Sequence, residues 1–152
     1  MRASRGLSPC AVVLALCDQA VTAHAVCLDP RTGQSGYRTP LGVEVAAAEA
    51  IVIGRVQSEE GLSDDPEDPD GISAFRSTID VLENLKGKAP AQLVVMNDNT
   101  SSRYAMATGE EHLLFLSQDG NRYWVNACGN SATRHEAEGL LKELRQLLRT
   151  KN

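Results

Sequence analysis

Ala50-Ile-Val-Ile-Gly-Arg-Val56 is the stretch that decides the fold, because it is apolar and rich in β-branched side chains. Such side chains pack well on the pleated, half-buried surface of a sheet. A glycine inside the stretch, Gly54, indicates a bulge or the close approach of another backbone. The stretch therefore predicts a buried strand.

Further strands are expected on the C-terminal side of this stretch. Residues 75–81 alternate between apolar and polar side chains, as in a strand with one solvated face. Residues 92–96 form a second short apolar run. Two more runs, 112–116 and 122–126, flank Ser117-Gln-Asp-Gly-Asn121, which is typical of a hairpin turn. These patterns predict an antiparallel sheet.

An acidic segment separates the first two predicted strands. Between Glu59 and Asp70 the chain has seven acidic residues, two prolines and no basic residue. Such a composition cannot bury a core, so residues 59–72 are predicted to form a solvated, mobile loop. A calcium loop is the alternative, but Pro66 and Ser77 would occupy its first and last ligand positions, and neither can serve there.

The chain ends in a predicted amphipathic helix. Thr133-Arg-His-Glu136 has the spacing of a capping box, in which two side chains satisfy the first backbone donors of a helix. Apolar residues then recur every three or four positions from 137 to 148, which places them on one face. We expect this face to pack on the sheet, with binding to a membrane surface as the alternative. Five strands and this helix predict a small, closed or nearly closed barrel.

The first residues are typical of a secretory signal. Two arginines precede an apolar run at 10–17, and Ala23-His24-Ala25 has the small residues that a signal peptidase recognises. The run is far shorter than the roughly 20 residues that span a membrane. We therefore expect residues 1–25 to be removed and Val26 to become the new N-terminus of a secreted or periplasmic protein. A buried N-terminal helix of a cytosolic protein is the alternative.

The mature part, residues 26–152, suits a single domain with one core. Removal of the signal leaves 13 basic and 19 acidic residues, a net charge of −6. Nucleic acid is therefore an unexpected partner, because binding to phosphates requires clustered lysine and arginine.

Two cysteines, Cys27 and Cys128, remain in the mature part, since the other two lie in the signal. In an oxidising compartment they most simply pair with each other. A disulfide that closes a loop of about 100 residues contributes about 4–5 kcal/mol in the chain-entropy model. A zinc site with His112 or His135, or a reactive thiol, is the alternative, although neither histidine lies in a zinc motif.

Catalytic motifs are missing from the sequence. It has no Gly-x-Ser-x-Gly, no phosphate-binding loop and no His-Glu-x-x-His. Glu110-Glu111-His112 has the residue types of an acid–base cluster, but neighbours in a strand point to opposite faces. We expect a hydrogen-bonded structural histidine there, and neither enzymatic activity, nor a cofactor, nor a metal centre.

The order of these segments resembles the tissue inhibitors of metalloproteinases and their bacterial relatives. The resemblance spans roughly Cys27 to Cys128 and implies the netrin-like barrel of the oligosaccharide/oligonucleotide-binding (OB) type, mainly β, with five strands and a C-terminal amphipathic helix. It rests on Ala48-Glu-Ala-Ile-Val-Ile-Gly-Arg-Val56, Phe75 to Val81 running into Leu85-Lys-Gly87, Gly109-Glu-Glu-His-Leu-Leu-Phe-Leu116, and Tyr123-Trp-Val-Asn-Ala-Cys128.

In that family the amine and carbonyl of an N-terminal cysteine chelate the zinc of the protease. This chain has Ala25 at the corresponding position, and near Met106, where the partner cysteine would lie, it has none. The resemblance therefore implies an exported, non-enzymatic interaction module, with metalloendopeptidase inhibition through the Val26 amine as the alternative. Its contacts with another exported protein are expected at Val26, Cys27, Leu28, Asp29, Ser101 and Ser102.

Overall fold

The fold was established from a computed structural model, which describes residues 27–63, 66–67, 70–100 and 102–150. The predicted signal, Val26 and Ser101 lie outside the described residues.

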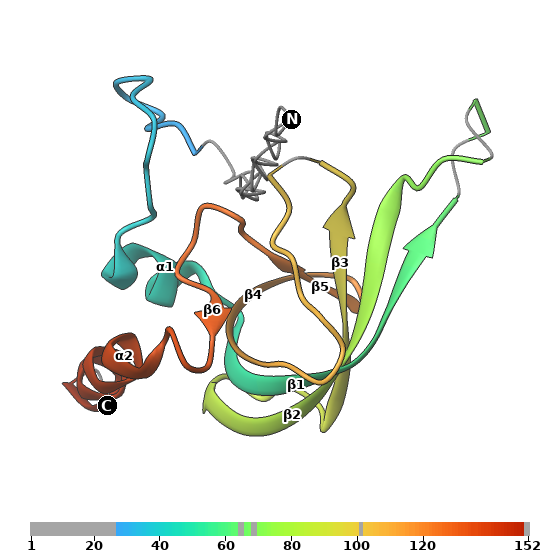
Figure 1. Ribbon diagram of the computed structural model, residues 1–152. Coiled ribbons are helices and arrows are strands. Elements are labelled where there is room, and N and C mark those ends of the chain that lie inside the picture. Colours follow the sequence, from blue (N-terminus) through green and yellow to red (C-terminus); the bar gives the residue numbers. More distant parts are fainter. Residues whose placement is uncertain (1–26, 64–65, 68–69, 101, 151–152) are drawn as a thin grey trace, which may run out of the picture.

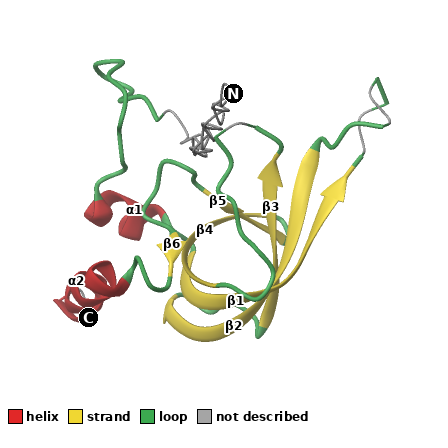
Figure 2. Cartoon of the chain, viewed as in Figure 1, coloured by secondary structure: helices red, strands yellow, loops and turns green. Residues whose placement is uncertain are grey.

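A closed, five-stranded barrel forms the body of the protein, and two helices pack beside it (Figures 1 and 2). The strands follow one another around the barrel in the order β1-β2-β3-β5-β4, and β4 pairs with β1 to close it. This arrangement is an OB-like barrel, as expected. The elements are α1 (Leu41–Ala47), β1 (Ala50–Leu62), β2 (Ala74–Lys86), β3 (Gln92–Asp98), β4 (Glu111–Asp119), β5 (Arg122–Val125), β6 (Ala132–Thr133) and α2 (Glu138–Thr150).

One pairing departs from the predicted antiparallel sheet. β3 and β5 run parallel, with Val95 opposite Tyr123 and Met96 opposite Trp124. The reason is geometric, because five strands that alternate in direction cannot close into a ring without one parallel pair. The hairpin between β4 and β5 is antiparallel as predicted, so the parallel pair falls where β5 meets β3.

β1 is buried on both faces, as its apolar sequence predicts. Val52 and Val56 point into the barrel and join its interior core. Ile51 and Ile53 point outward into a second core that α1 and α2 cover. Gly54 lies at a shift in register with β2, and a Cβ there would overlap the side chain of Ile79. The prediction of a bulge or close approach at this glycine is confirmed.

The loop that was predicted for the acidic segment begins later than expected. β1 continues to Leu62, so residues 59–62 are strand, and the connecting loop is limited to residues 63–73. Antiparallel pairing with β2 extends these residues, and the two strands form a ribbon that projects from the barrel (Figure 1). We call this ribbon, residues 57–62 of β1 and 74–78 of β2, the arm.

Half of the predicted capping box forms. The backbone N–H of Glu136 donates to Oγ1 of Thr133 over 3.4 Å, and the Thr133 hydroxyl donates to the Glu136 carboxylate over 2.8 Å. Thr133 itself belongs to β6, where it pairs with His112, so the regular helix begins only at Glu138. Leu141 and Leu144 bury its apolar face against the sheet, as predicted.

Candidate interaction surface at the disulfide end of the barrel

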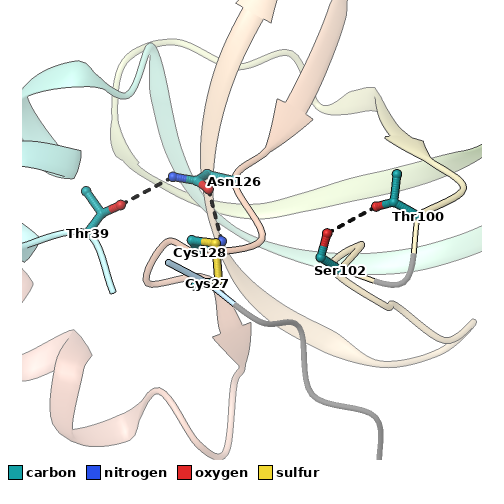
Figure 3. Close-up of a disulfide and its surroundings, with 6 residues drawn as sticks. All are labelled: Cys27, Thr39, Thr100, Ser102, Asn126 and Cys128. Carbon is teal, nitrogen blue, oxygen red and sulfur yellow. Dashed lines mark hydrogen bonds between the residues drawn. A yellow bond between two sulfur atoms is a disulfide. The ribbon is translucent and has the colours of Figure 1, made fainter. Parts of the chain in front are cut away.

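A disulfide links Cys27 to Cys128 across 101 residues, with 5.5 Å between the two Cα atoms (Figure 3). Two backbone hydrogen bonds flank it, from Tyr37 N–H to the carbonyl of Cys27 and from Thr39 N–H to the carbonyl of Cys128, each 2.9 Å long. The first described residues are therefore attached to the loop that follows β5. This is the pairing that the cysteine count predicts.

The segment after Cys27 forms a small closed loop. Leu28 forms a β-bridge with Ser35, and the Asp29 N–H donates to the carbonyl of Gln34 over 2.8 Å. The Asp29 carboxylate accepts from the N–H of Arg31 over 2.7 Å, which is typical of an aspartate that stabilises a turn. Leu28 remains 56% exposed. The loop therefore holds an apolar side chain in solvent beside the disulfide.

The buried carboxyl group of Glu44 connects α1 to the loop 126–131, which contains Cys128. Glu44 is 6% exposed, and its Oε2 accepts hydrogen bonds from both the backbone N–H and the side-chain amide of Asn130, each 2.6 Å long. Its Oε1 has no hydrogen-bond partner among the described residues and lies where a Cβ on residue 129 would stand. Burial raises the pKa of Glu44, and the Asn130 hydrogen bonds and the charge of Arg38 oppose this effect. Gly129 is therefore required for this contact.

The side chain of Asn126 completes the connection (Figure 3). Its carbonyl oxygen accepts from the N–H of Cys128 over 2.9 Å, and its amide donates to the hydroxyl of Thr39 over 3.3 Å. Beside it, a cavity of about 260 Å³ lies between α1 and β4, with Val43 and Phe115 in its lining.

The parallel pairing of β3 with β5 brings two distant loops to one end of the barrel. Neighbouring parallel strands have their carboxyl ends at the same edge. The loop 99–110, which follows β3, therefore leaves the barrel at the same end as the loop 126–131, which follows β5 and contains Cys128. We call the surface made by residues 27–39, 99–110 and 126–131 the disulfide end.

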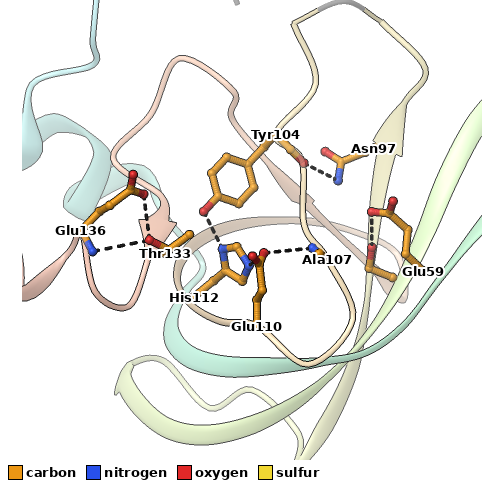
Figure 4. Close-up of polar contacts among 9 residues, drawn as sticks. Glu59, Asn97, Tyr104, Ala107, Glu110, His112, Thr133 and Glu136 are labelled. Carbon is orange, nitrogen blue, oxygen red and sulfur yellow. Dashed lines mark hydrogen bonds and ion pairs between the residues drawn. The ribbon is translucent and has the colours of Figure 1, made fainter. Parts of the chain in front are cut away.

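The loop 99–110 is attached to the barrel through His112 (Figure 4). His112 is 1% exposed, with its Nδ1 2.8 Å from the Tyr104 hydroxyl and its Nε2 3.2 Å from the Glu110 carboxylate. A carboxylate only accepts, so Nε2 carries the proton and Nδ1 accepts from the tyrosine. The backbone N–H of Ala107 also donates to Glu110. The expectation of a hydrogen-bonded histidine is confirmed. Of the residues Glu110-Glu111-His112, the structure brings Glu110 and His112 together, while Glu111 pairs with arginines.

Burial shifts the pKa values of His112 and Tyr104 in opposite directions. It lowers the pKa of His112, while the neighbouring Glu110 and Glu136 oppose the change. It raises the pKa of the Tyr104 phenol, with Glu136 and Glu110 adding to the effect. At neutral pH the imidazole is therefore neutral and the phenol protonated, which is the pairing that the hydrogen bonds require.

The outer part of the loop 99–110 carries polar side chains. The hydroxyls of Thr100 and Ser102 lie 3.3 Å apart (Figure 3). Arg103 lies 3.6 Å above the ring of Phe75 and contacts the Glu59 carboxylate at 3.4 Å, so it connects this loop to the arm. Ser102 therefore contacts Thr100 and precedes the residue that attaches this loop to the arm.

Of the residues predicted to contact a partner, Cys27, Leu28, Asp29 and Ser102 lie at the disulfide end. The sequence interpretation missed Glu44, Asn126 and Asn130, which hold this surface together. The two asparagines flank a cysteine in Asn126-Ala-Cys-Gly-Asn130, and such a cluster of amides beside a disulfide was the available signal.

No group of three or more metal-binding side chains was found within the described ranges. In the same part of the chain, no helix has the length and apolarity to cross a membrane.

Comparison of the sequence with protein-family models and with curated proteins found no match.

Proposed function

We propose that this protein is an exported, non-enzymatic interaction module that binds another exported protein through its disulfide end. The observation that carries the proposal is the disulfide between Cys27 and Cys128, which fixes the segment with the exposed Leu28 at the same end of the barrel as a loop that a second set of buried contacts holds in place. Rigid loops on a barrel are a common way to present a contact surface, because little conformational entropy is lost on binding.

The polar and apolar composition of the disulfide end supports this proposal. Leu28 is 56% exposed at this end, and the hydroxyls of Thr100 and Ser102 and the amide of Asn126 lie at the same end. Interfaces between proteins commonly combine a few apolar anchors with a polar rim.

The test replaces the exposed anchor and compares it with a matched site. The affinity-tagged mature protein, Leu28→Asp and Leu82→Asp are each incubated with the exported proteins of the source cells, and the captured proteins are quantified by mass spectrometry. Leu82 is 46% exposed and lies in the second half of β2, outside the disulfide end, which makes it a suitable control. We expect Leu28→Asp to lose a partner that the wild type and Leu82→Asp both retain. Equal capture by all three proteins would contradict the proposal.

Inhibition of a metalloendopeptidase through the mature N-terminus is the second candidate. It is favoured by the disulfide at Cys27, which would hold a neighbouring N-terminal amine in a fixed position, as chelation of a protease zinc requires. N-terminal sequencing of the exported protein and inhibition assays against a panel of exported metalloproteases test this idea. A chain that begins well before Val26, or full protease activity at micromolar protein, would exclude it.

A further inference from the structure

The outer face of β3 and β5 lies outside both hydrophobic cores. Along β3, Val95 points into the barrel, so its neighbours Val94 and Met96 point outward. Met96 stands opposite Arg76 of β2 and Trp124 of β5, which places these side chains on the same outer face. The two helices pack instead on the outer side of β1 and β4.

A cavity of about 270 Å³ opens on this outer face. Met96 is only 5% exposed there, although it belongs to neither of the two cores. The cavity therefore has an apolar floor on the outside of the barrel. Its lining consists of Leu62, Arg76, Val94, Met96, Asn121 and Arg122.

Of the two arginines in the lining, only one is paired. Arg76 contacts the Glu60 carboxylate at 2.7 Å. The exposed guanidinium of Arg122, at the start of β5, makes no ion pair or hydrogen bond with a described residue. No acidic side chain lines the cavity within the described part of the chain. The cavity therefore offers one positive charge that is free to meet a ligand.

This combination selects the chemistry of a ligand. Small-molecule sites commonly join an apolar lining to a few polar groups that fix orientation. A planar guanidinium binds a carboxylate through two parallel hydrogen bonds. An apolar body on Val94 and Met96, with a carboxylate on Arg122, would satisfy both parts of the lining. A cationic ligand would find no opposite charge there.

The volume of the cavity and its single free charge restrict the ligand further. About 270 Å³ lies near the lower end of the roughly 300–1,000 Å³ that is typical of ligand sites. A nucleic acid would need several clustered basic groups, and only Arg122 is free. We propose that this cavity binds a small molecule that carries one carboxylate on an apolar chain.

The cavity is separate from the surface in the proposed function, so either proposal can fail alone. Arg122 begins β5, whereas the loop that contains Cys128 follows the last residue of this strand, Val125. The variant Leu28→Asp is therefore expected to leave binding in the cavity unchanged.

The experiment titrates the isotope-labelled exported protein with hexanoate, hexan-1-ol, hexylammonium and acetate. Trp124 is the only tryptophan of the chain and stands opposite Met96, so its fluorescence reports on this face. Amide chemical shifts locate the site. We expect hexanoate to bind at millimolar concentration, to change the fluorescence and to shift the amides of residues 94–96 and 121–124. Hexan-1-ol should bind more weakly, and the other two compounds should not bind.

Matched variants test the role of the free charge. Arg122→Gln should weaken hexanoate binding about five-fold, because it removes one exposed ion pair, and should leave hexan-1-ol binding unchanged. Arg149→Gln is the control, since Arg149 is exposed in the last turn of α2 and likewise has no ion pair with a described residue. Equal weakening by both variants would overturn the proposal.

The four compounds give further ways to overturn it. Acetate that bound as well as hexanoate would indicate a simple anion site without an apolar part. Equal binding of hexylammonium would show that Arg122 selects nothing. Shifts confined to other parts of the protein, or no binding of hexanoate at tens of millimolar, would equally contradict the proposal.

Discussion

Residues 27–39 and the loop 99–110 lie at the same end of the barrel, but different forces hold them. In the first segment only Cys27 is buried, and the covalent bond to Cys128 takes the place of a core. The loop 99–110 has no covalent link and instead inserts Met106 and part of Tyr104 into the barrel interior. The difference teaches that a covalent bond can attach a segment too polar to pack, where apolar packing attaches another segment at the same end.

Loss of the disulfide has the largest expected effect on this comparison. Cys27→Ser combined with Cys128→Ser should lower the free energy of unfolding by about 2–5 kcal/mol, because the unfolded chain regains the entropy of a long loop. Thermal or denaturant unfolding measures the loss, and hydrogen exchange should increase in residues 28–39 before it increases in the loop 99–110. Equal exchange in both segments would show that packing, not the disulfide, holds the first one.

The contact between Gly129 and Glu44 gives the next largest effect. Gly129→Ala would force a methyl group into the position of Glu44 Oε1, so we expect a loss of about 1–3 kcal/mol. Gly139→Ala serves as the control, since Gly139 lies in α2 with open space around it. That control should stabilise the helix by about 0.5–1 kcal/mol. A Gly129→Ala protein as stable as the wild type would contradict the contact.

The loop 99–110 is held to the barrel by the hydrogen bond between the Tyr104 hydroxyl and His112. Tyr104→Phe leaves Nδ1 of the buried His112 without a partner and should lower stability by about 1–2 kcal/mol. Tyr37→Phe is the matched control, because within the described residues its hydroxyl makes no hydrogen bond. Both variants are measured by urea unfolding, and similar losses would mean that the hydrogen bond to His112 contributes nothing specific.

The contributions of Glu44 and His112 to the free energy of unfolding should change with pH in opposite directions. Burial lowers the pKa of His112, so the folded protein binds fewer protons there than the unfolded chain, and stability is lost as the pH falls below about 6.5. Burial raises the pKa of Glu44, so stability is lost as the pH rises above 4.5.

Urea unfolding between pH 4 and pH 8 measures both effects. Glu44→Gln should remove the decline with rising pH and leave the decline toward acid, whereas His112→Asn should do the reverse. If both variants kept the wild-type profile, other groups would control the pH dependence.

Local sequence patterns predicted much of the fold. The run Ala50–Val56 is apolar at every position but Gly54 and Arg55, which already indicates a strand covered on both faces. The apolar stripe of α2 and the hairpin between β4 and β5 could also be read locally, since each depends on residues close together in the chain. The length of the arm could not, because its acidic residues are extended by pairing with β2, not by their own preference.

The contacts that build the disulfide end could likewise be predicted only in part. The two cysteines that follow the predicted signal were enough to predict the link between Cys27 and Cys128. The contact of Glu44 with Asn130 joins residues 86 positions apart, and neither residue stands out in the sequence. The Tyr104–His112 hydrogen bond likewise depends on how the loop 99–110 folds back over the barrel.

The sequence by itself determined the barrel class, the terminal helix and the covalent link, because periodicity, turn residues and cysteine number act over short distances or through simple pairing. Only the tertiary structure decided that β3 and β5 run parallel, since a ring of five strands must contain one such pair. That closure also places the loop 99–110 and the disulfide at one end of the barrel.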